Sequence, residues 1–345
     1  MPSQAAEEGP CRLCGADDYR RLVTKLGYDV VRCRGCGLVF VWPQPAPEDL
    51  EALYSSGAYH GQIDQAERRR YAERRLDEIE RLVPPSGRLL DVGCSRGYLL
   101  EAARDRGWQA AGVELNPRSV ELARSRGLEV HCGQLADAPL APESFDVVTA
   151  FDVIEHLRSP RAFLAQVHRL LRPDGLLVLT TPNIGGLVPR CTYWLVGRTV
   201  GAWEHPTPPG HLVQFSRHTL FAILSRTGFR VAVWRAEHIP VAYSVGKLEN
   251  SVMDVLAGRH KQRPNIRGPR DFCRDSGNAR PVRRPRTSLP RLTVRAVAWV
   301  LLGTLWSLAR LTGLGDSQWA AARKTLTGGE TQPIGAKSDT GACPS

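Results

Sequence analysis

The sequence lacks the marks of a secreted or membrane-spanning protein. Its first ten residues are polar and contain Glu7 and Glu8, so they predict no signal segment. It has nine cysteines, an odd number that argues against a framework of paired disulfides. An uncharged apolar stretch at residues 296–309 is only fourteen residues long, whereas a bilayer span needs about twenty. We therefore expect a cytoplasmic protein.

Acidic residues are scarce in one segment, which accounts for most of the charge of the chain. The formal net charge is +11, and residues 259–295 contain twelve Lys and Arg against Asp271 and Asp275. The rest of the chain is close to neutral, so the net charge says nothing about the folded core. Residues 259–295 are rich in Pro, Gly and Arg and lack periodicity, which predicts a basic disordered insert.

Four of the cysteines have the spacing of a metal site. Cys11 and Cys14 are separated by two residues, and so are Cys33 and Cys36, eighteen residues further on. Two such pairs supply the four thiolates of a tetrahedral structural zinc site, which has no open position for catalysis. Four reduced thiols or two disulfides are the alternatives. The intervening residues predict a short hairpin within a zinc ribbon at residues 1–45.

A glycine turn follows an apolar run at residues 88–92. The turn extends from Gly93 to Gly97 and opens a helix, and a second apolar run ends in Glu114. This order of elements is that of a nucleoside-binding α/β half-domain. The glycine spacing is not the G-x-G-x-x-G of a dinucleotide site. Asp91, just before the turn, would repel a pyrophosphate but suits an ammonium group.

The turn resembles the first motif of the class I S-adenosylmethionine-dependent methyltransferases, D-V-G-C-G-x-G, with Ser95 in place of the middle glycine. The resemblance covers residues 85–325. It implies an α/β fold with a Rossmann-like seven-stranded sheet whose last strand is antiparallel. Further strands are expected at residues 128–132, 144–151, 176–181, 230–234 and 315–324. The cofactor-binding residues that we predict are Asp91, Gly93, Cys94, Gly97, Glu114, Leu115, Gln134, Leu135, Phe151 and Asp152.

The segment between the ribbon and this core is similar to a leader found ahead of small-molecule O-methyltransferases and sugar C-methyltransferases. Residues 46–84 are therefore expected to form a helical lead-in that covers the substrate pocket. By this resemblance Tyr54 and Tyr59 are pocket residues, and their alternative role is simple packing.

Two histidines are candidate general bases for a hydroxyl substrate. His156 follows the strand at residues 144–151 and has an ordinary pKa near neutrality. His211 resembles a family histidine at the pocket rim and follows a stretch, residues 184–210, that we interpret as a long functional loop. The alternatives are structural: His156 orients the following helix, or His211 bonds the loop backbone.

The remaining boundaries follow from composition. We expect a methyltransferase core at residues 85–258, an apolar helix with the last strand at 296–325, and a disordered tail at 326–345. The apolar helix is either a core helix or one that lies in a membrane interface, held by Trp299, Trp306 and the basic segment. The second alternative gives a peripheral membrane contact through residues 259–310.

The predicted function is methyl transfer from S-adenosyl-L-methionine to a small hydroxylated molecule, a sugar or a secondary metabolite, by O-methylation. The alternative is an RNA methyltransferase that binds RNA through the ribbon and the basic insert. Base-amine methylation is disfavoured because Asp152, Val153, Ile154 and Glu155 stand where an Asn/Asp-Pro-Pro-aromatic motif would be. A third alternative is a binding protein that has kept the fold without the activity.

Overall fold

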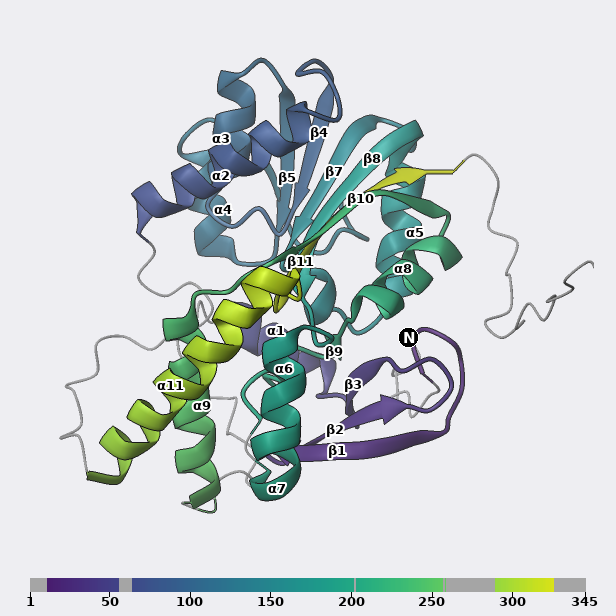
Figure 1. Ribbon diagram of the computed structural model, residues 1–345. Coiled ribbons are helices and arrows are strands. Elements are labelled where there is room, and N and C mark those ends of the chain that lie inside the picture. Colours follow the sequence, from purple (N-terminus) through teal and green to yellow (C-terminus); the bar gives the residue numbers. More distant parts are fainter. Residues whose placement is uncertain (1–10, 56–63, 202, 257, 259–288, 326–345) are drawn as a thin grey trace, which may run out of the picture.

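The computed structural model describes residues 11–55, 64–201, 203–256, 258 and 289–325. Its centre is a seven-stranded sheet with the order β10-β11-β8-β7-β4-β5-β6 (Figure 1). All strands are parallel except β11, which is antiparallel to both of its neighbours, so the predicted fold class is confirmed. The strands are β4 (Arg88–Val92), β5 (Gln109–Glu114), β6 (Glu129–Cys132), β7 (Phe145–Phe151), β8 (Leu171–Pro182), β10 (Phe229–Glu237) and β11 (Ser317–Lys324).

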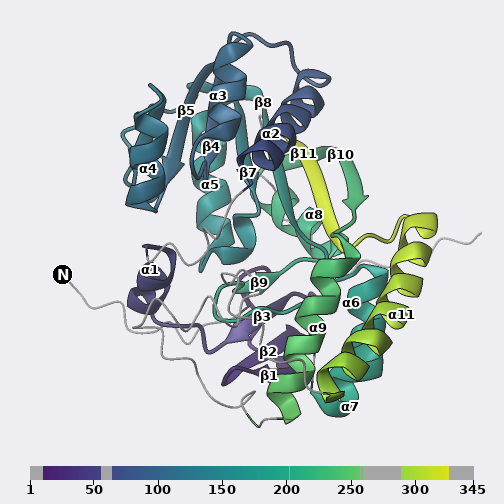
Figure 2. The same cartoon turned by 90° about the vertical axis from the view of Figure 1, so that its left-hand side faces the viewer.

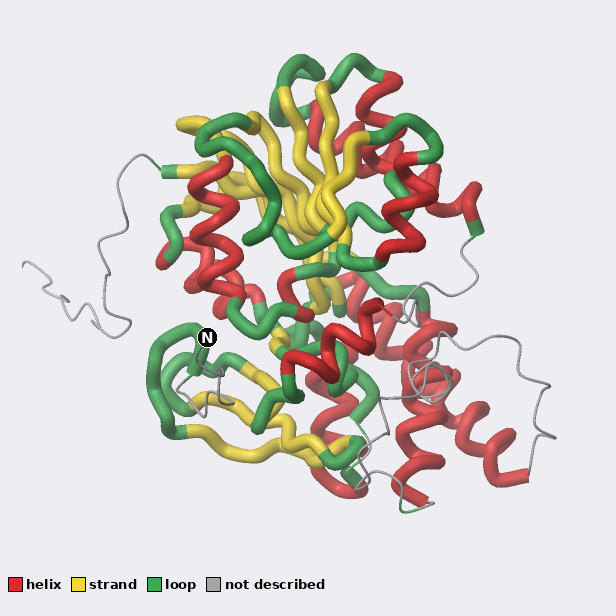
Figure 3. The backbone as a smooth tube through the Cα atoms, turned by 180° about the vertical axis from the view of Figure 1, so that it is seen from behind, coloured by secondary structure: helices red, strands yellow, loops and turns green. Residues whose placement is uncertain are grey.

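Helices cover both faces of this sheet, because alternate residues of each strand point to opposite sides. Leu89 packs under α2 (Gln65–Glu80), α3 (Tyr98–Asp105) and α4 (Pro117–Arg124). Its neighbour Leu90 packs on the other face with α5 (Pro160–Leu170) and α8 (Arg217–Arg226). Figure 3 shows the sheet between these two layers of helices. Strands β8 and β10 are longer than the sequence predicts.

The N-terminal ribbon is a second, smaller sheet of the order β1-β2-β3-β9. The predicted hairpin is present as β1 (Tyr19–Lys25) and β2 (Tyr28–Cys33). Strand β3 (Val39–Trp42) pairs with β9 (Val213–Gln214), which comes from the far side of the core and which the sequence did not predict. The ribbon is therefore completed by residues next to His211 and shares one hydrophobic core with α5 and α8.

The lead-in consists of two helices, α1 (Pro47–Ser55) and α2. Tyr54 lies on α1, and its carbonyl accepts a hydrogen bond from Asn116, just after β5, at 3.3 Å. Tyr59 lies outside the described residues. Figure 2 shows α1 between the two sheets.

The prediction of a long loop at residues 184–210 is wrong for residues 187–200, whereas residues 203–210 form no helix or strand. The segment forms α6 (Leu187–Thr192), a π-helical turn η2 (Tyr193–Gly197) and α7 (Arg198–Val200). Two of its Gly and Pro residues sit where a helix tolerates them: Gly186 is the N-cap and Pro189 lies in the first turn, where its missing N–H costs nothing.

Two further helices, α9 (Val241–Leu256) and α11 (Leu289–Thr312), lie side by side beside α6 (Figures 1 and 2). The basic insert predicted at 259–295 lies outside the described residues up to 288, and from 289 on it is helix. The expectation that the apolar stretch is too short to span a bilayer is also wrong. By length and composition alone, residues Thr293–Thr312 could cross a membrane, and only 17% of this window is buried. The tail at 326–345 lies outside the described residues.

Candidate functional site

The predicted glycine turn lies at the carboxyl end of β4, at the centre of the sheet. Gly93 and Gly97 have φ values of 75° and 78°, a region that side chains disfavour. A Cβ at Gly93 would lie 2.7 Å from Val153 Cγ2, and one at Gly97 would lie 2.5 Å from Leu128 Cδ1. Ser95 also has a positive φ, 49°, although it has a side chain. The turn therefore keeps the backbone close to whatever binds above β4.

The two predicted acids lie on either side of this turn and are both buried. Glu114 accepts hydrogen bonds from the Ser95 N–H at 2.9 Å and from the Asn116 N–H at 2.7 Å. Asp91 accepts one from the Thr149 hydroxyl at 2.7 Å. In the described part of the chain neither carboxylate forms an ion pair, so two buried acids stand together without a cation. A ligand with an ammonium group and hydroxyls would complement both.

Burial raises the pKa of Asp91 to about 7, and the negative charge of the nearby Glu114 adds to this increase. The hydrogen bond from Thr149 acts in the opposite direction and lowers the pKa. Because the folded-state pKa lies above the ordinary value of about 3.9, the unliganded protein loses stability as the pH rises from that value to about 7. An ammonium ligand favours the ionised form, so its binding releases a proton below pH 7. We expect the affinity for S-adenosylhomocysteine to fall about tenfold between pH 8 and pH 6.

Titration calorimetry at the two pH values, in buffers of different ionisation enthalpy, measures both the affinity and the proton release. Asp91→Asn should bind weakly and without the pH dependence. An affinity that is the same at pH 6 and pH 8 would contradict the assignment of Asp91 to the ligand's ammonium group.

The other predicted cofactor residues lie along the same edge. Leu115 follows Glu114 and is exposed, while Gln134 and Leu135 come two and three residues after Cys132, the partner of Glu114 in the sheet. Phe151 ends β7, and Asp152 follows with a φ of 54°. Cys94 is buried, and its sulfur would lie 2.6 Å from a Cβ at Gly112. It therefore packs beneath the turn, away from the open side of the site.

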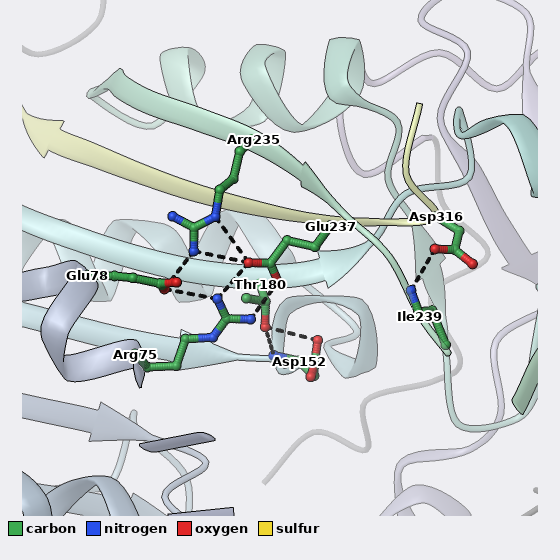
Figure 4. A network of polar contacts seen from close by, with 8 residues as sticks. All are labelled: Arg75, Glu78, Asp152, Thr180, Arg235, Glu237, Ile239 and Asp316. Atoms are coloured by element: carbon green, nitrogen blue, oxygen red, sulfur yellow. Dashed lines mark hydrogen bonds and ion pairs between the residues drawn. The ribbon is translucent and has the colours of Figure 1, made fainter. Parts of the chain in front are cut away.

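Helix α2 brings two residues to this edge that the sequence did not reveal. The Tyr71 ring lies 6.2 Å from that of Phe151, and the Arg75 guanidinium stacks 4.7 Å from the Tyr71 ring. Arg75 is only 4% exposed and donates to Glu237 at 2.7 Å, in the network that Figure 4 shows. In the same network Thr180 donates to Asp152 at 3.0 Å. These contacts fix α2 over the ends of β7 and β8.

The two predicted histidines lie together. Their rings are 4.6 Å apart, edge to face. Nδ1 of His156 lies 3.0 Å from the Gly210 carbonyl, and the Tyr54 hydroxyl donates to the same oxygen at 2.9 Å. The Tyr54 hydroxyl also lies 3.2 Å from His156 Nδ1. In the tautomer with its proton on Nδ1, that N–H donates to the Gly210 carbonyl and Nε2 is the basic nitrogen. The structure thus brings His156, His211 and Tyr54 into one cluster.

Burial lowers the pKa of His156 to about 4. Burial also lowers the pKa of His211 well below its usual value, and the neighbouring His156 adds to this decrease. Both rings are therefore neutral at physiological pH and can accept a proton. Glu155 lies beside them, buried, and accepts a hydrogen bond from Thr181 at 2.9 Å. A carboxylate oxygen of Glu155 and one ring nitrogen each of His156 and His211, which are atoms that could bind a metal ion, lie within 4.8 Å of one another.

A small pocket of about 20 Å³ adjoins His211 at the end of β8. It contains a pair that the sequence did not single out: His205 Nδ1 lies 2.7 Å from Glu204 Oε1, which also accepts from the Thr192 hydroxyl at 2.7 Å. The other oxygen, Glu204 Oε2, is buried and has no hydrogen-bond partner among the described residues. The lining residues are Pro182, Glu204, His205, His211, Ile239, Tyr243, Ser244 and Lys247. A ligand hydroxyl would satisfy the unpartnered oxygen.

The ribbon fixes the segment that carries this pair. Lys25, at the end of β1, donates from Nζ to the carbonyls of Trp203 and Pro206 at 3.0 and 2.9 Å. Burial lowers the pKa of Lys25 to about 8. Lys25 therefore connects the N-terminal sheet to the wall of the pocket.

The four predicted metal ligands converge at the far end of the ribbon. The sulfur atoms of Cys11 and Cys36, and those of Cys14 and Cys33, are each 3.5 Å apart, and all four lie within 4.8 Å of one another. These separations are too long for disulfides and close to the roughly 3.8 Å between thiolates around a tetrahedral zinc with bonds of about 2.3 Å. The donor set therefore fits a structural zinc ion.

Comparisons with known proteins agree with this geometry. A family model described as "Methyltransferase domain" matches residues 65–232. A probable S-adenosylmethionine-dependent methyltransferase of Mycolicibacterium smegmatis is 32% identical over 145 residues, which are 41% of this chain and 52% of that protein. A ubiquinone biosynthesis O-methyltransferase of Xylella fastidiosa is 30% identical over 176 residues, which are 47% of this chain and 72% of that protein.

The chain thus spans about half the length of the M. smegmatis relative and nearly three quarters of the X. fastidiosa one. Among solved structures, a SAM-dependent methyltransferase from Archaeoglobus fulgidus has a TM-score of 0.45 at 18% identity, and the match covers 74% of this chain and 94% of that one. The family model includes the glycine turn, both acids and both histidines, whereas the cysteine cluster, α9 and α11 lie outside it.

Proposed function

The chain belongs to the class I S-adenosylmethionine-dependent methyltransferases, and from this premise we propose that it methylates a hydroxyl oxygen of a small molecule. The observation that carries the proposal is the neutral pair of His156 and His211 between the cofactor edge of the sheet and the pocket. A hydroxyl needs a proton acceptor when it attacks a methyl group, and an unprotonated imidazole is one.

The residues at the carboxyl edge fit S-adenosylmethionine, which supplies an electrophilic methyl group when bound. Asp91 offers a buried carboxylate to an ammonium group. Glu114 keeps acceptor capacity for the two ribose hydroxyls, since each of its oxygens accepts one backbone N–H. Gln134 and Leu135 lie next to Glu114 and would contact the adenine base of the cofactor. Phe151 and Tyr71 would close the opposite side of the cofactor site.

The pocket residues bind and orient the acceptor. Glu204 Oε2 accepts a hydrogen bond from an acceptor hydroxyl, and His205 and Thr192 hold that carboxylate in place. His211, or His156 through Nε2, takes up the proton of the attacking hydroxyl. The helices and the ribbon around the pocket exclude water, and they place nucleophile and methyl group in line.

Support for oxygen as the acceptor atom comes from the X. fastidiosa relative, whose name is that of an O-methyltransferase. A sugar or a secondary metabolite remains our preferred acceptor, and cytoplasmic localisation remains a prediction. We also propose a structural zinc ion at Cys11, Cys14, Cys33 and Cys36. The alternative of RNA methylation rests on the ribbon together with residues 259–295, most of which lie outside the described part of the chain, and we do not advance it.

The test is methyl transfer from labelled S-adenosylmethionine to a panel of small phenols, catechols and sugars. We expect a methyl ether as product. We expect His211→Ala to lower kcat by roughly 10²-fold, the low end for the loss of a general base. Its affinity for S-adenosylhomocysteine should stay within about threefold, since no cofactor residue contacts His211.

The matched control is His218→Ala, because His218 is exposed on α8 and should leave kcat unchanged. Full activity in both His156→Ala and His211→Ala would exclude these residues as the proton acceptor. A methylated nitrogen or carbon in the product would overturn the proposed reaction.

A further inference from the structure

Helix α11 has one face that is buried and one that has no partner among the described residues. Ala298 and Leu302, four residues apart, are buried against α9 and α6 in a cluster with Val188, Val245 and Leu248. Ala309, seven residues after Leu302, is also buried. This spacing defines one helix face. A helix at the surface of a water-soluble domain would carry polar side chains on the opposite face.

Helix α11 carries apolar side chains there instead. Val297, Val300, Leu308 and Leu311 are three or eight residues apart and form a second stripe, and the exposed Thr304 and Ser307 lie in its gap. Val300 is 74% exposed and Leu311 is 85% exposed. Isolated exposed apolar residues are common on proteins, but four of them on one helix face over four turns mark an interaction surface.

Neighbouring elements carry further exposed apolar side chains. Trp194, Leu195 and Val200 are more than half exposed on the η2–α7 segment, which continues from α6, and Leu256 is exposed at the end of α9. Figure 2 shows α6, α9 and α11 beside one another at the end of the molecule away from α3. We call these helices, with η2 and α7, the helical face.

The charged residues of the helical face are mostly cationic. Helix α11 contains three arginines and no Asp or Glu, and residues 187–200 contain Arg190 and Arg198 and no acid. Two guanidinium groups stack on indoles: Arg198 lies 4.8 Å from the Trp194 ring, and Arg310 lies 4.8 Å from that of Trp306. Apolar stripes beside Trp and Arg match the layered chemistry of an anionic membrane surface.

We propose that the helical face docks the protein on the surface of an anionic lipid bilayer, with the exposed stripe of α11 in the headgroup–acyl boundary. This binding event goes beyond methyl transfer and does not depend on it. Two other occupants fit less well. Residues 259–288 have only Ile266, Phe272 and Val282 as large apolar residues, too few to cover the stripe. In a symmetric second copy, α11 and residues 187–200 would bring their arginines together, and neither segment has an acid to pair them.

The connections of α11 indicate that it lies in the interface and does not span the bilayer. Near its C-terminal end, Asp316 accepts a hydrogen bond from the Ile239 N–H at 2.8 Å, just before α9 begins (Figure 4). The chain leaves the central sheet just before α9 and returns to it just after α11. This hydrogen bond therefore holds the two points together at the sheet. If α11 crossed the bilayer, the chain before it would have to cross as well. Helix α9 is unsuited to this, because it carries Lys247, Glu249 and Asp254, and charged side chains are costly inside a membrane.

The test is sedimentation of the full-length protein with vesicles of equal parts phosphatidylcholine and phosphatidylglycerol, and with pure phosphatidylcholine vesicles. We expect binding to the anionic vesicles that weakens at high salt. We expect Val300→Glu and Leu311→Glu each to lower the partition coefficient about tenfold. Both positions are exposed, so S-adenosylhomocysteine binding in the same samples should be unchanged and reports that the fold is intact.

The matched control is Leu122→Glu, an exposed leucine on α4 that should leave vesicle binding unaltered. The absence of binding to anionic vesicles would overturn the proposal, as would an equal loss in the control. A wild-type dimer that Leu311→Glu converts to a monomer, without vesicle binding, would assign the face to a second copy. Resistance of the bound protein to alkaline carbonate extraction would show a spanning helix and overturn interfacial docking.

Discussion

Glu114→Ala is expected to weaken the binding of S-adenosylhomocysteine by about 10³-fold. The carboxylate accepts the N–H groups of Ser95 and Asn116 and still has lone pairs for two ribose hydroxyls. Charge-assisted hydrogen bonds contribute roughly 1.5–3 kcal/mol each, so losing the two to the ligand costs about 4 kcal/mol. The backbone of the turn would lose its anchor as well, because the Ser95 N–H would have no acceptor.

Titration calorimetry of the purified protein with S-adenosylhomocysteine measures this effect. Glu114→Gln keeps one carbonyl oxygen and should fall between wild type and Glu114→Ala. Glu129→Ala is the matched control, since Glu129 is exposed at the start of β6 and should not change the affinity. Binding by Glu114→Ala within tenfold of wild type would remove Glu114 from the cofactor site.

Loss of the cysteine cluster is expected to abolish methyl transfer while it leaves cofactor binding nearly intact. Structural zinc sites in small domains contribute about 10–16 kcal/mol to folding, so Cys33→Ser should unfold the ribbon. The ribbon supplies Lys25, which holds the segment around Glu204, and β3, which pairs with β9 beside His211. The cofactor acids stand in β4 and on β5, in the other sheet.

Three measurements test this separation. Elemental analysis should give about one zinc per chain in wild type and none in Cys33→Ser. The affinity for S-adenosylhomocysteine should change by less than about threefold, while methyl transfer falls to background. Cys132→Ser is the control, because Cys132 is exposed outside the cluster. A fully active, metal-free protein would refute the structural role of the cluster.

The cofactor edge could be predicted from the sequence because its information is local. Asp91, Gly93 and Gly97 lie within seven residues, and their order sets strand, turn and helix without reference to the rest of the chain. Family resemblance added Gln134 and Asp152, and parallel strands bring such positions to one edge of the sheet.

The residues that the sequence did not reveal depend on distant contacts. Arg75 belongs to helix α2, whose many charged residues predict a helix exposed to solvent. The Arg75 guanidinium is nevertheless buried, in contact with Tyr71 and Glu237. Glu204 and His205 become a pair only because Lys25 and Thr192 hold their segment. Neither contact has a periodic pattern, so only the folded chain shows them.

The position of β11 has a consequence for how this protein is made. Strand β11 is inserted between β8 and β10, although it is synthesised after both. Until then both strands expose edges that invite pairing with other chains. The ribbon has a similar delay: at 5–20 residues per second, β3 waits roughly 10–30 s for β9 to be translated. A nascent chain therefore carries two unfinished sheets for much of its synthesis, and chaperones are expected to protect them.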